Sequence, residues 1–139
     1  MVDYNRAMTV FRVVLMVLAV LNLLIAGFGA LFSQFADGGD FYSRLILTFL
    51  HPISALSVMA LVLTLRLPVG IVIALTAIFV LNIAADSALA VLIASGNMKG
   101  DWPLPLLFSV VPAIAIIYSV LRLRTLQQPP DDADQPNET

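Results

Sequence analysis

The sequence contains no cysteine, and this absence removes several classes of function at once. Without a thiol the chain can form neither a disulfide nor a thiolate nucleophile, and cysteine-containing metal centres are excluded. It also has a single histidine, His51, so neither a usual zinc site nor a haem held by two histidines of one chain can form. Any chemistry must come from other side chains.

Charged residues are scarce as well. They make up 12% of the chain while 60% is hydrophobic, against about 25% and about 45–50% in ordinary soluble domains. The net charge of −2 is too small to indicate a nucleic-acid partner. The sequence also lacks the P-loop, GxSxG, HExxH and dinucleotide-binding motifs, so we do not expect an enzyme.

What the sequence has instead is four long apolar blocks. They cover residues 13–32, 45–65, 69–94 and 103–121, with short connections between them. A helix of about 20 apolar residues spans the hydrocarbon core of a bilayer, which is roughly 30 Å thick. Short connections place neighbouring helices antiparallel. The sequence therefore predicts an all-α membrane protein, an up-down bundle of four transmembrane helices.

The distribution of lysine and arginine predicts the orientation of this bundle. Four spans place both termini on one side, where five basic residues lie, against two on the other side. The first set is Arg6, Arg12, Arg66, Arg122 and Arg124, and the second is Arg44 and Lys99. Because cytoplasmic loops carry the excess of basic residues, both termini are expected in the cytoplasm of a bacterial inner (plasma) membrane.

Three parts of the chain follow from this topology. Residues 1–12 are expected to form a short cytoplasmic N-terminus, and residues 13–124 the transmembrane domain. Residues 125–139 include the sequence QQPPDDADQPNET, which is rich in proline, acid and amide and has nothing to bury. Such a composition is typical of disorder, so we expect an acidic, disordered cytoplasmic tail.

Strongly polar residues inside the apolar blocks are few: Asn22, His51, Asn82 and Asp86. An ionised group at the bilayer centre costs about 2.5–3.5 kcal/mol on insertion scales, so such residues usually face the bundle interior. With each block centred in the bilayer, Asn22 and Asn82 fall near the midplane, and His51 and Asp86 both lie about 6 Å toward the outside. This equal depth predicts a hydrogen bond between His51 and Asp86 within an intramembrane polar cluster of the four residues.

Small and polar residues recur at helical spacing around these positions. Close packing explains them without any chemistry, because small residues let membrane helices approach and polar ones bond across the interface. Asp86 is harder to explain by packing alone. The stripes are Ala19, Asn22, Ala26, Gly29 and Ser33; Thr48, His51, Ser54 and Ala55; and Asn82, Ala85, Asp86 and Ala90.

Two prolines interrupt the predicted spans. Pro52 lacks the amide hydrogen that would bond to the carbonyl of Thr48, and Pro112 leaves the carbonyl of Phe108 without its usual donor. The second and fourth helices are therefore expected to bend near these positions.

Three functions remain open from the sequence. The first is a non-enzymatic accessory or scaffold subunit, packed against a larger membrane complex or against copies of itself. The second is a small proton-linked transporter or channel in which His51 and Asp86 form the protonatable pair. The third is a subunit that shapes a quinone or haem pocket, with His51 as the contact. No motif indicates a cofactor, and the expected partners are the lipid bilayer and another membrane protein or a second copy.

Overall fold

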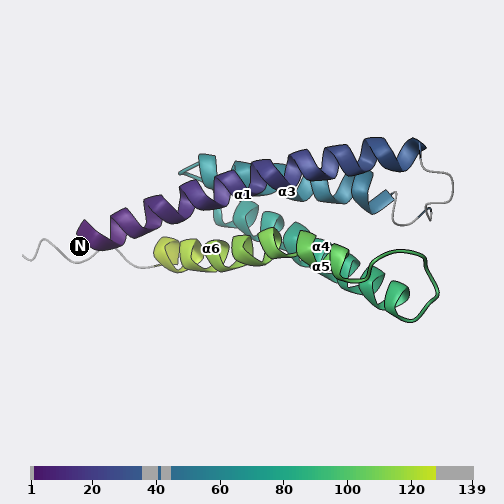
Figure 1. Cartoon of the computed structure of the whole chain (residues 1–139). Helices are drawn as coiled ribbons and strands as arrows, with labels where there is room; N and C mark the ends of the chain where they lie inside the picture. Colours follow the sequence, from purple (N-terminus) through teal and green to yellow (C-terminus); the bar gives the residue numbers. More distant parts are fainter. Residues whose placement is uncertain (1, 36–40, 42–44, 128–139) are drawn as a thin grey trace, which may run out of the picture.

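The computed structural model describes residues 2–35, 41 and 45–127 of the chain, and this part is helical throughout apart from short connections, with no strand. Figure 1 shows the helices in chain order. They are α1 (Val2–Phe35), the π-helical turn η1 (Ile46–Leu50), α3 (His51–Leu63), α4 (Val69–Ala94), α5 (Pro103–Phe108) and α6 (Val110–Gln127). The prediction of an all-α chain is confirmed for these residues.

Within the described residues, three helical stretches are long and apolar enough to cross a membrane: Arg6–Leu31, Val69–Ala94 and Pro103–Leu126. The remaining apolar stretch, Thr48–Leu63, is shorter. The prediction of a membrane protein is thus supported by three helices of spanning length. By length and composition, Thr48–Leu63 does not qualify as a membrane-spanning helix, so the predicted second crossing stays a prediction.

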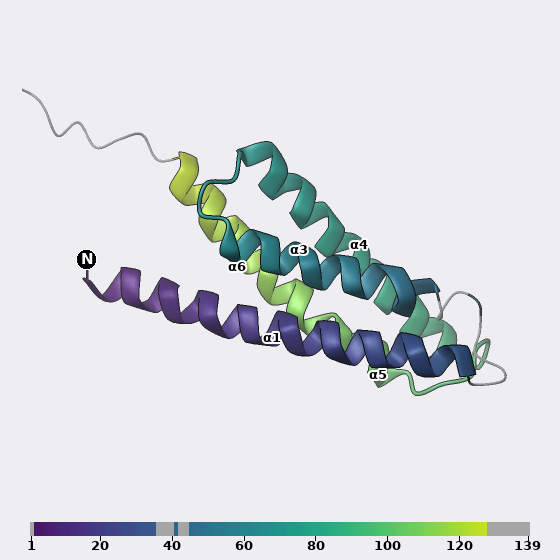
Figure 2. The same cartoon turned by 90° about the horizontal axis from the view of Figure 1, so that it is seen from above.

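The helices form two antiparallel pairs that pack against each other. α1 lies along α3, and α4 lies along α5 and α6, as Figures 1 and 2 show from two directions. α3 joins the pairs by contacting both α4 and α6. The first residues of α1 and the last residues of α6 lie at the same end of the bundle (Figure 1).

The helix bounds agree with the predicted blocks at some points and differ at others. α4 covers residues 69–94 as predicted, but α1 begins at Val2 instead of residue 13, and α6 ends at Gln127 instead of residue 121. The rings of Phe11 and Tyr118 meet edge to face, 5.7 Å apart. Because tertiary contacts of this kind continue past the apolar blocks, the helices continue with them.

Residues 2–12 are helical and continuous with the first predicted span, and residues 125–127 of the predicted tail are helical too. The division into a cytoplasmic N-terminus, a transmembrane domain and a tail stays a prediction. The rest of that tail, residues 128–139, lies outside the described residues, as do Ser33's side chain and Arg44. In the second block the helix ends at Leu63, two residues before the predicted end, because the backbone of Thr64 is extended (φ −89°, ψ 108°).

Both interior prolines coincide with departures from regular α-helix. The turn η1 ends where the amide of His51 donates to the carbonyl of Ile46, five residues back, and Pro52 follows directly. In the last block α5 stops at Phe108, and the amide of Ser109 donates to the carbonyl of Leu106, three residues back. Pro112 lies within the first turn of α6. The missing proline amides account for both interruptions.

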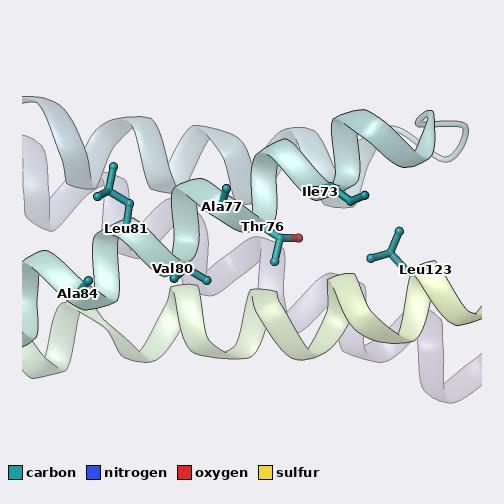
Figure 3. Close-up of a pocket in the computed structure, with 7 residues that line it drawn as sticks. All are labelled: Ile73, Thr76, Ala77, Val80, Leu81, Ala84 and Leu123. Atoms are coloured by element: carbon teal, nitrogen blue, oxygen red, sulfur yellow. The ribbon is translucent and has the colours of Figure 1, made fainter.

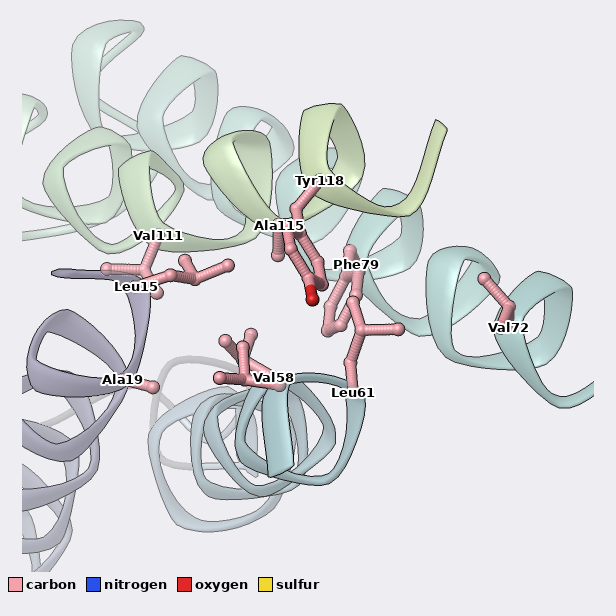
Figure 4. Packing of buried hydrophobic residues seen from close by; sticks show 10 residues of the cluster. Leu15, Ala19, Val58, Leu61, Val72, Phe79, Val111, Ala115 and Tyr118 are labelled. Atoms are coloured by element: carbon pink, nitrogen blue, oxygen red, sulfur yellow. The ribbon is translucent and has the colours of Figure 1, made fainter. Parts of the chain in front are cut away.

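Apolar side chains fill the half of the bundle nearest the start of α1 and the end of α6. In Figure 4, Leu61, Phe79 and Tyr118 point toward one another from α3, α4 and α6. This core holds the helices by close contact, because in lipid the hydrophobic effect adds little to the pairing of helices. The remaining members are Leu15, Ala19, Val58, Val62, Val72, Val111 and Ala115.

Candidate functional site

A polar cluster lies in the bundle interior and is centred on the carboxylate of Asp86. Asp86 is fully buried and His51 is 1% exposed. Nε2 of His51 lies 2.7 Å from Oδ1 of Asp86, which makes the hydrogen bond that equal depth predicts between α3 and α4. This hydrogen bond joins two residues that are 35 positions apart in the sequence, and it connects the two helix pairs.

The second carboxylate oxygen is also in use. Nδ2 of Asn82, one turn earlier on α4, donates to Oδ2 at 2.6 Å. The hydroxyl of Ser109 donates to the same oxygen at 2.9 Å, from the interruption between α5 and α6. Asp86 therefore bonds to α3, to its own helix and to the last helical block, and both of its oxygens have partners. We call Asp86, His51, Asn82 and Ser109 the Asp86 cluster.

Ser109 belongs to this cluster but is not among its predicted members. It lies about 4.5 Å from the middle of its block by helical rise, toward the same side as His51 and Asp86. Depth alone does not mark a serine as a member of the cluster, because its hydroxyl can also bond to a carbonyl of its own helix.

Phe108 fixes the imidazole of His51 from one face. The two rings are stacked, with centroids 4.6 Å apart and planes 10° from parallel. Stacking of this kind limits rotation of the imidazole and keeps Nε2 directed at Asp86. Nδ1 of His51 is buried and has no hydrogen-bond partner among the described residues.

The His51–Asp86 pair can hold its shared proton in two ways. With the proton on the imidazole, the pair is an imidazolium and a carboxylate, and with the proton on Asp86 both groups are neutral. The total charge is zero in either state. Zero total charge is what a buried site in a membrane requires, since an isolated ion there is costly.

Asn22, the fourth predicted member, is buried at 6% exposure but does not bond to Asp86. Its Nδ2 has no hydrogen-bond partner among the described residues, and the same holds for Oγ of Ser54 and Oδ1 of Asn82. The structure therefore brings His51, Asp86 and Asn82 together and leaves Asn22 outside their hydrogen bonds.

Few residues of the cluster offer ligands to a metal or cofactor. Within the described part of the chain no three residues of the types His, Cys, Asp and Glu gather in one place. Nε2 of His51 bonds to Asp86 and one ring face is covered by Phe108. A haem or quinone at His51 would therefore have to bond through Nδ1.

A second polar region lies at the end of α3, where two arginines bind backbone carbonyls. Nη1 of Arg122 donates to the carbonyl of Leu61 at 2.5 Å, and its Nη2 donates to those of Thr64 and Leu65 at 2.6 and 2.7 Å. Nη2 of Arg12 donates to the carbonyl of Val62 at 2.6 Å. The last carbonyls of a helix lack intrahelical donors, and a cation there is favourable to the helix dipole.

An apolar groove opens on the outer face of α4, beside the end of α6. Its volume is about 550 Å³. The hydroxyl of Thr76 in this groove donates to the carbonyl of Val72 on its own helix, so it presents little polarity. Figure 3 shows the lining side chains: Ile73, Thr76, Ala77, Val80, Leu81, Ala84 and Leu123.

No protein family, curated protein or solved structure matches this chain in comparisons with known proteins. Within the described residues, the Asp86 cluster, the arginines at the end of α3 and the groove on α4 are the features from which a function can be proposed.

Proposed function

We propose that the chain is a small integral membrane protein that acts as a non-enzymatic accessory or scaffold subunit, within a larger membrane complex or a homo-oligomer. In this proposal the helical residues 45–63 form a fourth crossing, since they rise about 28 Å at 1.5 Å per residue. Both termini then face the cytoplasm of a bacterial inner membrane. The excess of arginine at that end supports this orientation.

The bonding of Asp86 carries the proposal. Both carboxylate oxygens are occupied by side chains of the same bundle, and Asp86 is fully buried. A carboxylate with partners on both oxygens and no exposure serves first to fix the positions of helices. Interhelical hydrogen bonds in membranes contribute about 0.6–2 kcal/mol each, enough in sum to select one packing arrangement.

The groove on the outer face of α4 supports the proposal that another membrane helix packs against this bundle. Ala77 and Ala84 lie seven residues apart on one face of α4 and line its groove. Small residues at such spacing let the backbone of another membrane helix approach closely. The fitting partner is a helix of a larger complex or of a second copy of this chain.

Native mass spectrometry of the chain, extracted gently from its own membrane, tests the proposal. We expect a bound membrane protein or a defined number of copies. The substitution Ala77→Phe fills the groove and should reduce that assembly, whereas Ala113→Phe, at an exposed position of α6, should leave it unchanged. A solitary monomer from the native membrane would contradict the accessory role.

A second candidate function is a proton-linked transporter or channel. The observation in its favour is a buried pair that shares a hydrogen bond, together with buried polar atoms that have no hydrogen-bond partner among the described residues: Nδ1 of His51, Oγ of Ser54 and Nδ2 of Asn22. Protonatable pairs inside membranes are typical of proton coupling. Proton flux in liposomes separates the two functions: a transporter loses flux in Asp86→Asn at normal protein levels, whereas an accessory subunit shows no flux in either form.

A further inference from the structure

The arginine end of the bundle has a positive charge that the side chains described in the structure do not balance. Arg122 is 8% exposed and Arg12 is partly buried. Guanidinium groups keep their positive charge in proteins. Among the side chains that the structure describes, the only carboxylates are Asp86, which bonds to His51, and Asp101, in the connection between α4 and α5.

The carbonyls at the end of α3 offset only part of this charge. A helix C-terminus is equivalent to roughly half a negative charge, and the two guanidinium groups carry two positive charges. In addition, Nε of Arg12 is buried and donates to no acceptor among the described residues. A buried donor on a cation without an acceptor is costly, so an anion at this place is favoured.

Two grooves meet at Arg12, and they differ in character. The first, of about 220 Å³, opens between α1 and α6 and is lined by Arg12, Tyr118 and Arg122 among others. The second, of about 320 Å³, opens between α1 and α3, and apart from Thr9 and Arg12 it is apolar, with Met16 and Val62 in its wall. A cationic groove and an apolar groove thus share one arginine.

We propose that this end of the bundle binds one anionic phospholipid, with the phosphate held by Arg12 and Arg122 and an acyl chain in the groove between α1 and α3. Arginine donates bidentately to phosphate oxygens, and basic pockets between membrane helices on the cytoplasmic side bind anionic head groups. The inference rests on the proposed membrane placement, but not on the accessory role.

The adjoining apolar groove favours a lipid over a free anion. A soluble phosphate would use only the cationic groove, whereas a phospholipid joins a phosphate to an acyl chain and fills both. The two arginines also lie in the helical stretches Arg6–Leu31 and Pro103–Leu126, toward the ends that begin α1 and finish α6. That is the depth at which head groups meet a transmembrane helix.

Lipid titration of the full, delipidated chain in detergent, read by native mass spectrometry, tests the site. Phosphatidylglycerol and phosphatidylcholine with identical acyl chains are compared. We expect the first bound lipid to favour phosphatidylglycerol by at least about fivefold, since each arginine near a membrane surface contributes roughly 1 kcal/mol toward an anionic lipid. Arg12→Gln should remove most of this preference, and Arg12→Lys should keep part of it.

Arg124→Gln is the matched control, because Arg124 is exposed on the last turns of the same helix as Arg122. It should change the lipid preference by less than about twofold, since its charge lies outside both grooves. Circular dichroism of each variant checks that helical content is retained. Arg12→Gln is preferred to Arg122→Gln because Arg12 binds one carbonyl of α3 and Arg122 binds three.

Two results would overturn the proposal. One is equal binding of the two lipids, or a preference that Arg12→Gln leaves unchanged. The other is displacement of phosphatidylglycerol by millimolar inorganic phosphate, which would assign the arginines to a free anion. Neither result affects the oligomeric state on which the accessory role depends, so the two proposals fail independently.

Discussion

The bundle buries polar groups in two regions, and the regions differ in the partners that their ionisable side chains have among the described residues. In the Asp86 cluster, the carboxylate has the imidazole of His51 as its counterpart and two further donors on its second oxygen. At the end of α3, the guanidinium groups of Arg12 and Arg122 have only backbone carbonyls as acceptors among the described residues.

On the proposals above, the first region serves the fold and the second binds a lipid. The carboxylate of Asp86 has partners on both oxygens, and these bonds restrict how the helices pack. A region whose positive charge is not balanced by the described side chains attracts anions even where its hydrogen bonds also cap a helix. Substitutions in the first region should therefore change stability, and those in the second should also change what the protein binds.

The largest effect is expected from Asp86→Ala. The change leaves His51, Asn82 and Ser109 without their common acceptor, and we expect a loss of about 3 kcal/mol in the free energy of unfolding. Equilibrium unfolding in mixed micelles of increasing dodecyl sulfate content measures it. Asp101→Ala, at an exposed carboxylate, should show no measurable change. A loss below about 1 kcal/mol would mean that the cluster does not hold the helices together.

Arg122→Gln is expected to cost somewhat less, about 2 kcal/mol, because three carbonyl bonds are weakened while the charge is lost. The last turn of α3 should fray, so backbone amides of residues 61–65 should exchange hydrogen faster while those near Asp86 are unaffected. Arg124→Gln is the control for charge alone. If exchange quickened equally in both regions, the two regions would belong to one cooperative unit.

Ser109→Ala separates the bonds within the Asp86 cluster. We expect a loss of about 1 kcal/mol, since Oδ2 of Asp86 keeps its bond from Asn82. Ser119→Ala is a close control, because Ser119 is fully buried but its hydroxyl bonds to the carbonyl of Ala115 on the same helix. Equal losses of unfolding free energy for Ser109→Ala and Ser119→Ala would show that the hydrogen bond between helices contributes no more stability than the bond within one helix.

Phe108→Leu should have the smallest effect, about 0.5–1 kcal/mol, because it removes the stacking on His51 but keeps an apolar contact. The more informative readout is the imidazole itself, followed by nitrogen chemical shifts of His51. Loss of the stacked ring should broaden or shift these signals. Unchanged signals would mean that Asp86 alone fixes the ring.

The contact between His51 and Asp86 could be predicted from the sequence, because the depth of a residue along an apolar block depends only on residue counting. Residue counting does not predict that Phe108 stacks on His51 or that Asn22 lies outside the hydrogen bonds of Asp86, since both depend on how each helix is rotated about its axis. The rotation of the last block changes at Ser109, where α5 ends before α6 begins. No periodicity in the residues reveals an offset of that kind.

The arginines were read from the sequence only as markers of orientation. Their role as caps depends on α3 ending at Leu63 and leaving carbonyls that face Arg12 and Arg122. An apolar run that continues to residue 65 hides that end. Likewise the start of α1 could not be placed, because contacts such as that between Phe11 and Tyr118 decide it.

The π-helical turn before His51 has a consequence for the phase of the whole second block. Such a turn contains one residue more than an α-helical turn, so the residues before and after it are offset by about 100° around the helix axis. Thr48, which shares α-helical spacing with His51 in the sequence, is for this reason only partly buried, whereas His51 and Ser54 are buried. The residues of the turn and those of α3 can therefore present different faces to their neighbours. A deletion of one residue within 46–50 would restore α-helical spacing across the turn and rotate the residues before His51 about the axis relative to α3.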